Sequence, residues 1–345
     1  MVSLNIKNMV KIAGKLSTNI ILFKDILLKK IKKDSVKKIM IYITGDTHRE
    51  FYRLHNIEKN QENMLIILGD AGINYYLNEE DKKLKKHLNN CNIKLFCVQG
   101  NHEERPENIP TYNEVDMFGG KVFIEEDYPN LIFAKNGELY TIDNKKVLVI
   151  GGAYSVDKDY RLAYGYQWFK DEQLSKDEMD KILDKYKDEH IDIILSHTCP
   201  LKYEPTEEFM KGIDQSKVDK TMEMFLDKIE EIVDYDKWYC GHYHIEKQVD
   251  KIEFMFGRIK VFNKDEFVPK YNRMGYEIIR DAYSMDCIMG KDAYCPKCNS
   301  KDIIIQKGDG HKIYGADFIA IICNKCKKVY GFNDVKYKPN CPKEL

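Results

Sequence analysis

The sequence lacks the features that would mark a membrane, secreted or fibrous protein. No uninterrupted run of about 18 apolar residues occurs, so we expect no membrane-spanning helix. The N-terminus has lysines among its apolar positions and no small-residue cleavage pattern, so we expect no secretion signal. With only 9 Pro and 20 Gly in 345 residues, the chain is neither collagen-like nor of low complexity. We expect a soluble globular protein of the cytoplasm.

Overall charge is also nearly absent. The formal net charge is −1, which gives no global attraction to nucleic acid or to anionic lipid. The exception is local: residues 1–38 carry ten lysines against Asp25 and Asp34. A nucleic-acid or membrane-surface arm is one interpretation of this segment. Solvated helices packed on the core are the interpretation that we favour, so we expect a basic helical extension that the chemistry does not need.

Length and hydrophobic content predict a large domain with an appendage. The chain has 345 residues and is 43% hydrophobic, enough for a sizeable core. Because the first strong strand pattern begins at residue 39, we place the main domain at 39–263. A linker at 264–290 and a small module at 291–345 follow.

Short apolar runs alternate with helical patterns through the main domain. Buried strands are predicted at Ile39–Thr44, Met64–Leu68, Ile93–Val98, Val147–Ile150, Ile191–Leu195 and Trp238–Cys240. Ser175 and Glu178 form a capping-box pattern before one amphipathic helix, and a second helix is expected between Val218 and Val233. The fold class is therefore α/β with a layered sheet.

Polar residues follow five of these strands directly. They are Asp46 and His48, Asp70, Asn101 with His102, His197, and His242 with His244. Loops at the carboxyl ends of strands converge on one crevice in an α/β sheet, so these side chains are expected to meet. Carboxylate, amide and imidazole donors suit Mn²⁺, Fe or Zn²⁺. A pair of metal ions needs a shared carboxylate, and Asp70, alone in its motif, is the natural bridge.

The ordered set of D-x-H, G-D, G-N-H-E, a lone His and G-H-x-H resembles the calcineurin-like metallophosphoesterase superfamily. The resemblance covers roughly residues 39–262 and extends weakly to Gly151–Ala153, Asp157 and Arg161, as in small bacterial and phage members. It implies a two-sheet sandwich flanked by helices. It also implies two divalent ions, held by two ligand sets that share Asp70: Asp46, His48, Asp70 and His244 for one ion, and Asp70, Asn101, His197 and His242 for the other.

The resemblance implies a mechanism as well. A hydroxide lying between the metal ions would attack phosphorus in line, and His102 would protonate the leaving oxygen as general acid. An imidazole has a pKa suited to that role. The substrate would be a phosphomonoester or phosphodiester, with nucleotides, nucleic acid, phosphoproteins and lipid head groups all open.

Two arginines are candidates for substrate contacts. Arg49 follows His48 where Gly is common in the family, so it either takes the turn despite its Cβ or contacts phosphate. Arg161 lies in an aromatic-rich stretch, Tyr154–Trp168. This stretch could pack on the domain, or its rings could stack on a nucleobase while Arg161 contacts a phosphate. The chain lacks the G-D-x-x-D-R-G pattern of protein Ser/Thr phosphatases after Gly69, which argues against that activity.

Four C-terminal cysteines form two C-x-x-C pairs, Cys295 with Cys298 and Cys323 with Cys326, separated by 24 residues. Four thiolates at this spacing suit a structural tetrahedral Zn²⁺, so the segment resembles a zinc ribbon. Strands are expected at Ile303–Ile305 and Phe318–Ile322, and Cys341 has no role. The module either stabilises the chain or docks nucleic acid or a partner.

A second hypothesis from another class remains. The chain could be a non-catalytic nucleic-acid or partner-binding protein that uses the basic N-terminus and the ribbon, with a purely structural metal site. The complete ligand set and His102 argue against it. The sequence indicates no oligomeric state.

Overall fold

The computed structural model describes the expected main domain and most strands of the C-terminal module. The described residues are 39–187, 189–209, 214–268, 270–271, 277–279, 295, 298, 300–308 and 318–333. The expected N-terminal extension, 1–38, and Cys341 lie outside them. Within these residues, no helix has the length and apolar character needed to cross a membrane.

The first sheet has seven strands in the order β13-β1-β2-β3-β6-β5-β4. Strands β1, β2, β3 and β6 are parallel, and the outer strands pair antiparallel. Its strands are β1 (Ile41–Thr44), β2 (Met64–Ile67), β3 (Lys94–Cys97), β4 (Tyr112–Met117), β5 (Gly120–Glu125), β6 (Leu131–Ala134) and β13 (Lys260–Val261).

The second sheet has six strands in the order β11-β12-β10-β9-β8-β7. Strands β8, β9, β10 and β12 are parallel, and β7 and β11 close the edges antiparallel. Its strands are β7 (Glu138–Ile142), β8 (Lys145–Ile150), β9 (His190–Ser196), β10 (Asp234–Cys240), β11 (Lys247–Val249) and β12 (Ile252–Phe254).

The two sheets pack face to face over an apolar interior. Ile66 and Phe96 of the first sheet and Val149 and Leu195 of the second belong to one buried cluster. Continuous apolar runs such as Met64–Ile67, buried at every position, are typical of parallel strands covered on both faces. This two-sheet sandwich confirms the predicted fold class.

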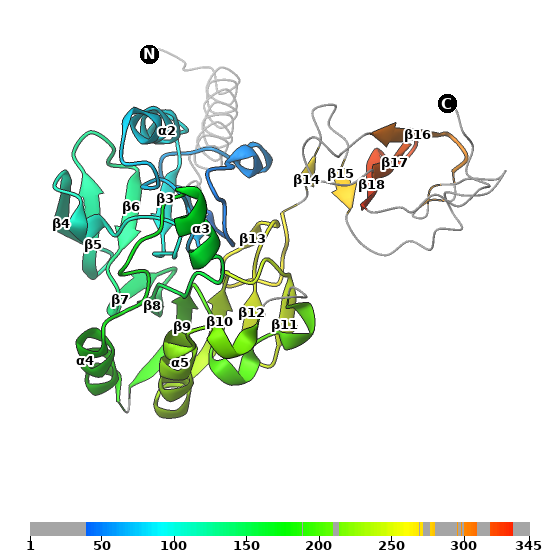
Figure 1. Cartoon of the computed structure of the whole chain (residues 1–345). Coiled ribbons are helices and arrows are strands. Elements are labelled where there is room, and N and C mark those ends of the chain that lie inside the picture. The colour runs from blue at the N-terminus through cyan, green and yellow to red at the C-terminus, as the bar shows by residue number, and fades with distance from the viewer. Residues whose placement is uncertain are drawn as a thin grey trace, which may run out of the picture. The chain divides into compact units, whose positions relative to one another are not determined.

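Helices cover the outer faces of the sheets: α2 (Glu79–Asn89) lies beside the first sheet, and α4 (Lys176–Tyr186) and α5 (Thr221–Ile232) lie beside the second (Figure 1). Helix α3 (Lys158–Tyr164) has no buried residue and lies instead near the strand ends. Short 3₁₀ helices occur at Tyr52–Asn56, Pro106–Asn108, Leu201–Tyr203, Thr206–Glu208 and Gln215–Lys217. The apolar sides of α4 and α5, with Ile182 and Phe225, join Ile194 and Trp238 of the second sheet in another buried cluster. The capping box of Ser175 and Glu178 is present at the start of α4, as predicted.

The six predicted strands all exist, and their ends differ from the predicted ones by up to four residues. The largest difference is in β10, which begins at Asp234 rather than Trp238 because its exposed first half alternates polar and apolar residues. The stretch Tyr154–Trp168 contains the short helix α3, with no buried residue.

A third sheet forms the C-terminal module, in the order β14-β15-β18-β17-β16. Its strands are β14 (Lys270–Tyr271), β15 (Glu277–Ile279), β16 (Ile303–Gly308), β17 (Phe318–Cys323) and β18 (Lys328–Asn333). β16 and β17 fall where strands are predicted. Since β15 pairs in parallel with β18, part of the segment expected as a linker belongs to this sheet.

Candidate metal centre

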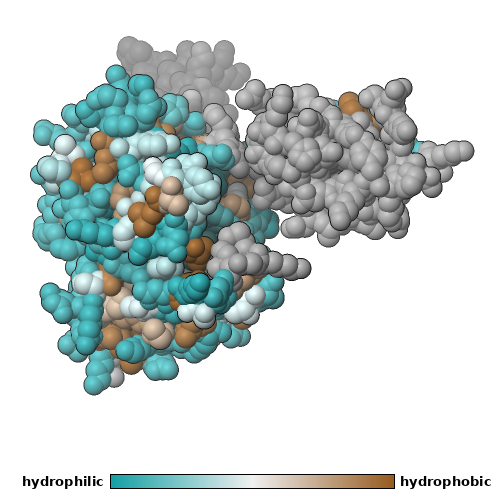
Figure 2. All heavy atoms as spheres, in the orientation of Figure 1, coloured by the Kyte–Doolittle hydropathy of each residue, from teal (hydrophilic) through white to brown (hydrophobic). Residues whose placement is uncertain are grey.

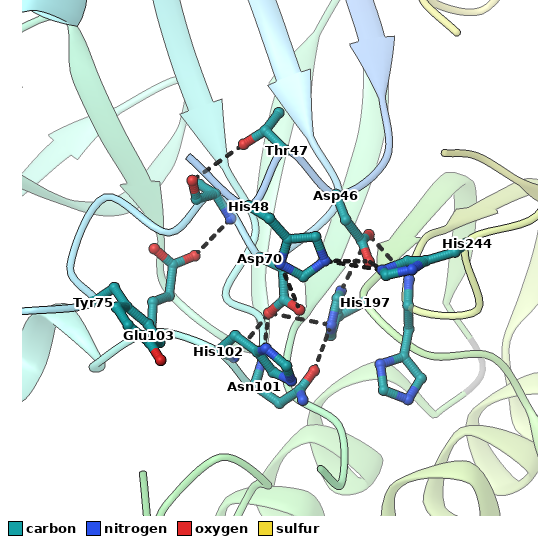
Figure 3. A network of polar contacts seen from close by, with 12 residues as sticks. Asp46, Thr47, His48, Asp70, Tyr75, Asn101, His102, Glu103, His197 and His244 are labelled. Atoms are coloured by element: carbon teal, nitrogen blue, oxygen red, sulfur yellow. Dashed lines mark hydrogen bonds and ion pairs between the residues drawn. The ribbon is translucent and has the colours of Figure 1, made fainter. Parts of the chain in front are cut away.

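The polar residues that follow β1, β2, β3, β9 and β10 gather at the carboxyl ends of the two sheets. Figure 3 shows the side chains of Asp46, Asp70, Asn101, His197 and His244 pointing toward one another. Four residues of the group have a positive φ, which is uncommon for side chains with a Cβ: His48, Asp70, His242 and His244. Residues with a strained backbone are found mainly at functional sites, where contacts with the surrounding structure stabilise the unfavourable conformation.

One part of the cluster contains Asp46, His48 and His244. Asp46 Oδ2 lies 3.1 Å from His244 Nε2 and 3.8 Å from His48 Nε2, and the two imidazole nitrogens lie 2.9 Å apart. Asp46 Oδ1 accepts a hydrogen bond from the His242 backbone N–H at 3.0 Å, which leaves Oδ2 facing the histidines.

The other part contains Asp70, Asn101 and His197. His197 Nε2 lies 2.8 Å from Asn101 Oδ1 and 3.5 Å from Asp70 Oδ1. His197 Nδ1 lies 2.7 Å from the Leu68 carbonyl oxygen and donates to it, so Nε2 presents its lone pair to these two oxygens. Three acceptors therefore converge at one point.

Asn101 is oriented by two buried residues that the sequence did not reveal. Its Nδ2 donates to Ser155 Oγ at 2.8 Å, and Ser155 Oγ donates to Glu172 Oε2 at 2.5 Å. This chain fixes the amide so that Oδ1, rather than Nδ2, faces His197. Such supporting hydrogen bonds orient the ligands of a metal ion. No short motif links Asn101, Ser155 and Glu172, so only the fold brings them together.

Asp70 lies between the two parts of the cluster. Its Oδ1 accepts from the backbone N–H groups of Asn101 and His102, both at 2.9 Å, and its Oδ2 is 3.8 Å from His48 Nδ1. Burial acts to raise the pKa of Asp70, but the neighbouring His102, His197 and His48 lower it overall. Asp70 is therefore ionised and reaches both halves of the site.

Glycines allow the backbone to approach these groups closely. A Cβ on Gly100 would lie 2.0 Å from Asp70 Oδ1, and a Cβ on Gly69 would lie 2.0 Å from His197 Nδ1. Gly69 also has a φ of +89°. Only glycine meets both demands, which explains the G-D and G-N-H-E patterns.

His102 lies at the rim of the cluster, beside α3. Its Nδ1 is 2.6 Å from Arg161 Nη2, and its Nε2 is 3.8 Å from Asp157 Oδ1. Arg161 is itself held by Asp157 Oδ2 at 2.8 Å. Burial and the Arg161 charge outweigh the opposing Asp70 charge and lower the pKa of His102.

Arg49 adopts a φ of +69°, so it takes the turn despite its Cβ. Its guanidinium donates to Asp81 Oδ1 at 2.5 Å and to the Gly72 carbonyl at 2.7 Å, and it stacks on Tyr76. A phosphate contact by Arg49, as the sequence suggested, would replace these interactions.

Glu103 completes the G-N-H-E motif from within the protein interior. Its carboxylate accepts from the backbone N–H groups of Ala71 and Ile73 and thereby fixes the loop that follows Asp70. Burial, together with the Asp70 charge, raises the pKa of Glu103 to about 8. The motif revealed this residue, but not its positioning role.

The donor set fits divalent ions. Asp46 Oδ2 is buried and has no hydrogen-bond partner among the described residues, although two imidazole nitrogens lie near it. Asp46, His48 and His244 can each place a ligand atom within 4.8 Å of the others, and so can Asp46, Asp70 and His197. Burial lowers the pKa of His242 to about 3, so this imidazole is neutral, the form that binds metal.

A second cluster lies in the C-terminal module. Cys295, Cys298, Cys323 and Cys326 can place their sulfur atoms within 4.8 Å of one another. The Sγ atoms of Cys295 and Cys326 are 3.5 Å apart, and those of Cys298 and Cys323 are 3.6 Å apart, so the thiols are not disulfide-bonded. The arrangement is compatible with a zinc-ribbon-like module.

Fold and site together define an α/β sandwich with a cluster of metal-binding groups at its strand ends. The family model for the calcineurin-like phosphoesterases matches residues 39–246, more than half of the chain. The chain belongs to this family. Membership implies hydrolysis of phosphate esters in general, with divalent metal ions in the active site. No curated protein matches the chain.

Proposed function

We propose that the chain is a binuclear metal-dependent phosphoesterase with His102 as general acid. The observation that supports this most is the position of Asp70 between two groups of donors, one with Asp46, His48 and His244 and one with Asn101 and His197. One ion would be held by Asp46, His48, Asp70 and His244. The other would be held by Asp70, Asn101, His197 and His242. When bound, Mn, Fe or Zn ions would supply an activated water and positive charge for the phosphate oxygens.

The chain's own residues then orient the substrate and deliver a proton. His102 lies next to the ligand Asn101 but binds Arg161 through Nδ1. Because a guanidinium only donates hydrogen bonds, Nδ1 accepts and the ring proton is on Nε2. To act as general acid, His102 would be the imidazolium, formed when Nδ1 takes up a second proton from solvent. It would give its Nε2 proton to the leaving oxygen, and the ring would return to the neutral form. General acid catalysis of this kind contributes about 10²- to 10⁴-fold.

The proposed Cys₄ site would hold one structural Zn²⁺ apart from this chemistry. A closed tetrahedral site of four thiolates leaves no position open for a substrate. Zinc binding would stabilise the fold of the module rather than take part in hydrolysis.

The test is hydrolysis of p-nitrophenyl phosphate and bis-p-nitrophenyl phosphate by the full chain with added Mn²⁺. Asp70→Asn should reduce the activity to background, because it removes the carboxylate that both ions share. With phenyl phosphate, whose leaving oxygen needs a proton, His102→Ala should lower kcat by about 10²-fold or more while metal content stays unchanged.

Asp180→Asn, on the exposed side of α4, is the matched control and should retain full activity. Absence of turnover with Mn²⁺, Fe²⁺ or Zn²⁺ in the wild-type chain would refute the proposal and favour the non-catalytic binding protein.

A further inference from the structure

The cavity at the metal centre extends well beyond the proposed ligands. Its volume is about 310 Å³, within the range of small-molecule sites. His48, Asp70, Asn101 and His242 line one side. The rest of the lining, which we call the far wall, consists of flat or apolar side chains and several acids: Tyr154, Val156, Phe209, Val218, Tyr243, Asp157, Glu204, Glu208 and Glu223. Apart from Asp157, which holds Arg161, these residues have no role in the proposed hydrolysis.

A hydrogen-bond network forms part of this far wall. Thr198 Oγ1 donates to Glu223 Oε1 at 2.7 Å and lies 3.1 Å from the Tyr243 hydroxyl. The same hydroxyl lies 3.3 Å from Glu204 Oε1. Thr198 directly follows His197, and Tyr243 lies between His242 and His244, so two residues of the far wall are sequence neighbours of proposed metal ligands. A ligand bound to the far wall would therefore have a fixed position relative to the metal centre.

Glu223 has one carboxyl oxygen that the protein does not satisfy. The residue is 3% exposed, and Oε2 has no hydrogen-bond partner among the described residues. A buried polar atom without a partner destabilises the fold and calls for an explanation. Burial raises the pKa of Glu223 to about 7, as expected for a carboxyl group with little solvent. A hydrogen-bond donor on a bound ligand would satisfy Oε2.

The charge of the far wall restricts what can bind. Among the described residues, the cavity lining beyond the proposed metal ligands contains four acids, Asp157, Glu204, Glu208 and Glu223, and one lysine, Lys220. Lys220 Nζ is paired with Glu204 Oε1 at 2.6 Å, and Asp157 is paired with Arg161, which leaves Glu208 and Glu223 without a salt-bridge partner in the described part of the lining. A further phosphate group placed here would meet like charges at short range. An uncharged group is favoured instead.

Two aromatic rings offer a flat surface beside these acids. Phe209 and Tyr243 lie with their ring planes within 10° of each other and their centroids 6.1 Å apart. Lys220 Nζ lies 5.0 Å from the Phe209 ring centroid, within the range of a cation–π contact. Parallel aromatic surfaces of this kind suit a planar ring in the ligand.

We propose that the far wall binds the leaving group of a small phosphomonoester, and that this group is an uncharged molecule with a planar ring and hydrogen-bond donors. Nucleoside monophosphates belong to this class. The inference rests on the proposed phosphoesterase activity, since the metal centre would hold the phosphate. It assigns Glu223 as the residue that selects donor-bearing leaving groups, and it disfavours polynucleotides and nucleoside triphosphates.

The experiment compares kcat/KM of the Mn²⁺-loaded full chain for adenosine 5′-monophosphate, ribose 5-phosphate, adenosine 5′-triphosphate and a single-stranded oligonucleotide. The first two share the same ester bond and differ by the base. We expect about tenfold higher kcat/KM for the nucleoside monophosphate than for ribose 5-phosphate, and lower values for the triphosphate and the oligonucleotide. Equal values for the first two, or a higher value for the oligonucleotide, would overturn the inference.

The variant Glu223→Gln keeps the size of the side chain but places an N–H₂ group where Oε2 accepts. It should lower the ratio of kcat/KM for the nucleoside monophosphate over that for p-nitrophenyl phosphate about tenfold. Glu231→Gln, on the exposed side of the same helix, should leave the ratio unchanged. An unchanged ratio in Glu223→Gln refutes the subsite. If the wild-type chain shows no metal-dependent hydrolysis of p-nitrophenyl phosphate, the proposed function is refuted instead.

Discussion

Asn101 and His102 are neighbours in the sequence, yet their side chains are held by different partners. The Asn101 amide is held by Ser155, inside the domain, whereas the His102 ring is held by Arg161 of the exposed helix α3. Figure 2 shows hydrophobic side chains over and beside α3 within a largely hydrophilic face, in keeping with the exposure of Val156 and Leu162. The group proposed to hold metal is therefore fixed more rigidly than the proposed proton donor.

Arg161→Ala tests whether Arg161 positions His102. Without the guanidinium, the neutral ring loses the contact that orients it, so proton delivery should suffer. We expect this loss of orientation to outweigh the rise in the pKa of His102 that follows from removing the Arg161 charge. We expect kcat for phenyl phosphate to fall about tenfold more than kcat for 2,4-dinitrophenyl phosphate, whose leaving group needs no proton. Steady-state kinetics with both esters measures the difference.

The sequence-based prediction for Arg161 was a phosphate contact, and the same experiment distinguishes it. Loss of a phosphate contact would raise KM for both esters alike and leave the kcat ratio unchanged. That outcome would contradict a positioning role.

At the scale of residues, the motifs predicted that the candidate metal ligands lie close together, but not which residues orient them by hydrogen bonds. Asp46, Asp70, Asn101 and His197 each follow a buried strand, and parallel strands deliver their ends to one edge of a sheet. Ser155 lies in the loop before α3 and Glu172 in the loop after it, and neither strand order nor spacing indicates that they reach Asn101. Their partners follow only from the fold.

Helix α5 shows how an element serves both the core and the cavity. Its apolar residues Met222, Phe225 and Leu226 pack against the second sheet, while Glu223 lines the cavity beside the metal centre. The helical pattern was visible in the sequence, but a carboxylate among apolar positions gave no sign that it would be buried.

The buried Glu223 should make stability depend on pH. Its pKa is raised from 4.5 to about 7, so the folded state binds more protons than the unfolded state between these values. The free energy of unfolding should therefore fall as pH rises through this interval. Glu223→Gln removes the effect and should gain about 1 to 3 kcal/mol relative to wild type between pH 5 and pH 8.

Urea unfolding of metal-free wild type and Glu223→Gln at both pH values measures this change. Glu231→Gln provides the control for a carboxylate lost from the surface of the same helix. A constant stability difference between wild type and Glu223→Gln across the interval would contradict the raised pKa.

At the scale of the whole molecule, two clusters of potential metal ligands lie on different sheets. The sandwich presents oxygen and nitrogen donors, and the module presents four thiols. Sequence motifs predicted both clusters, because C-x-x-C pairs and Asp and His residues at strand ends can be recognised locally in the sequence. The pairing of β15 with β18 was not predictable, because Glu277–Ile279 has only three residues, too few for a strand pattern to show in the sequence.

Metal analysis of the full chain should find one tightly bound zinc beyond the ions of the active site. Cys298→Ser removes one of four thiolates and should lower the zinc content by about one equivalent. The Mn²⁺-dependent activity toward p-nitrophenyl phosphate should persist. Unchanged zinc content in this variant would show that the four cysteines do not form the site.

The central claim is that two divalent ions share Asp70. The most direct measurement is anomalous diffraction from crystals of the Mn²⁺-loaded chain. We predict two anomalous peaks about 3.5 to 4 Å apart, one on each side of the Asp70 carboxylate. A single peak, or peaks remote from Asp70, would contradict the account.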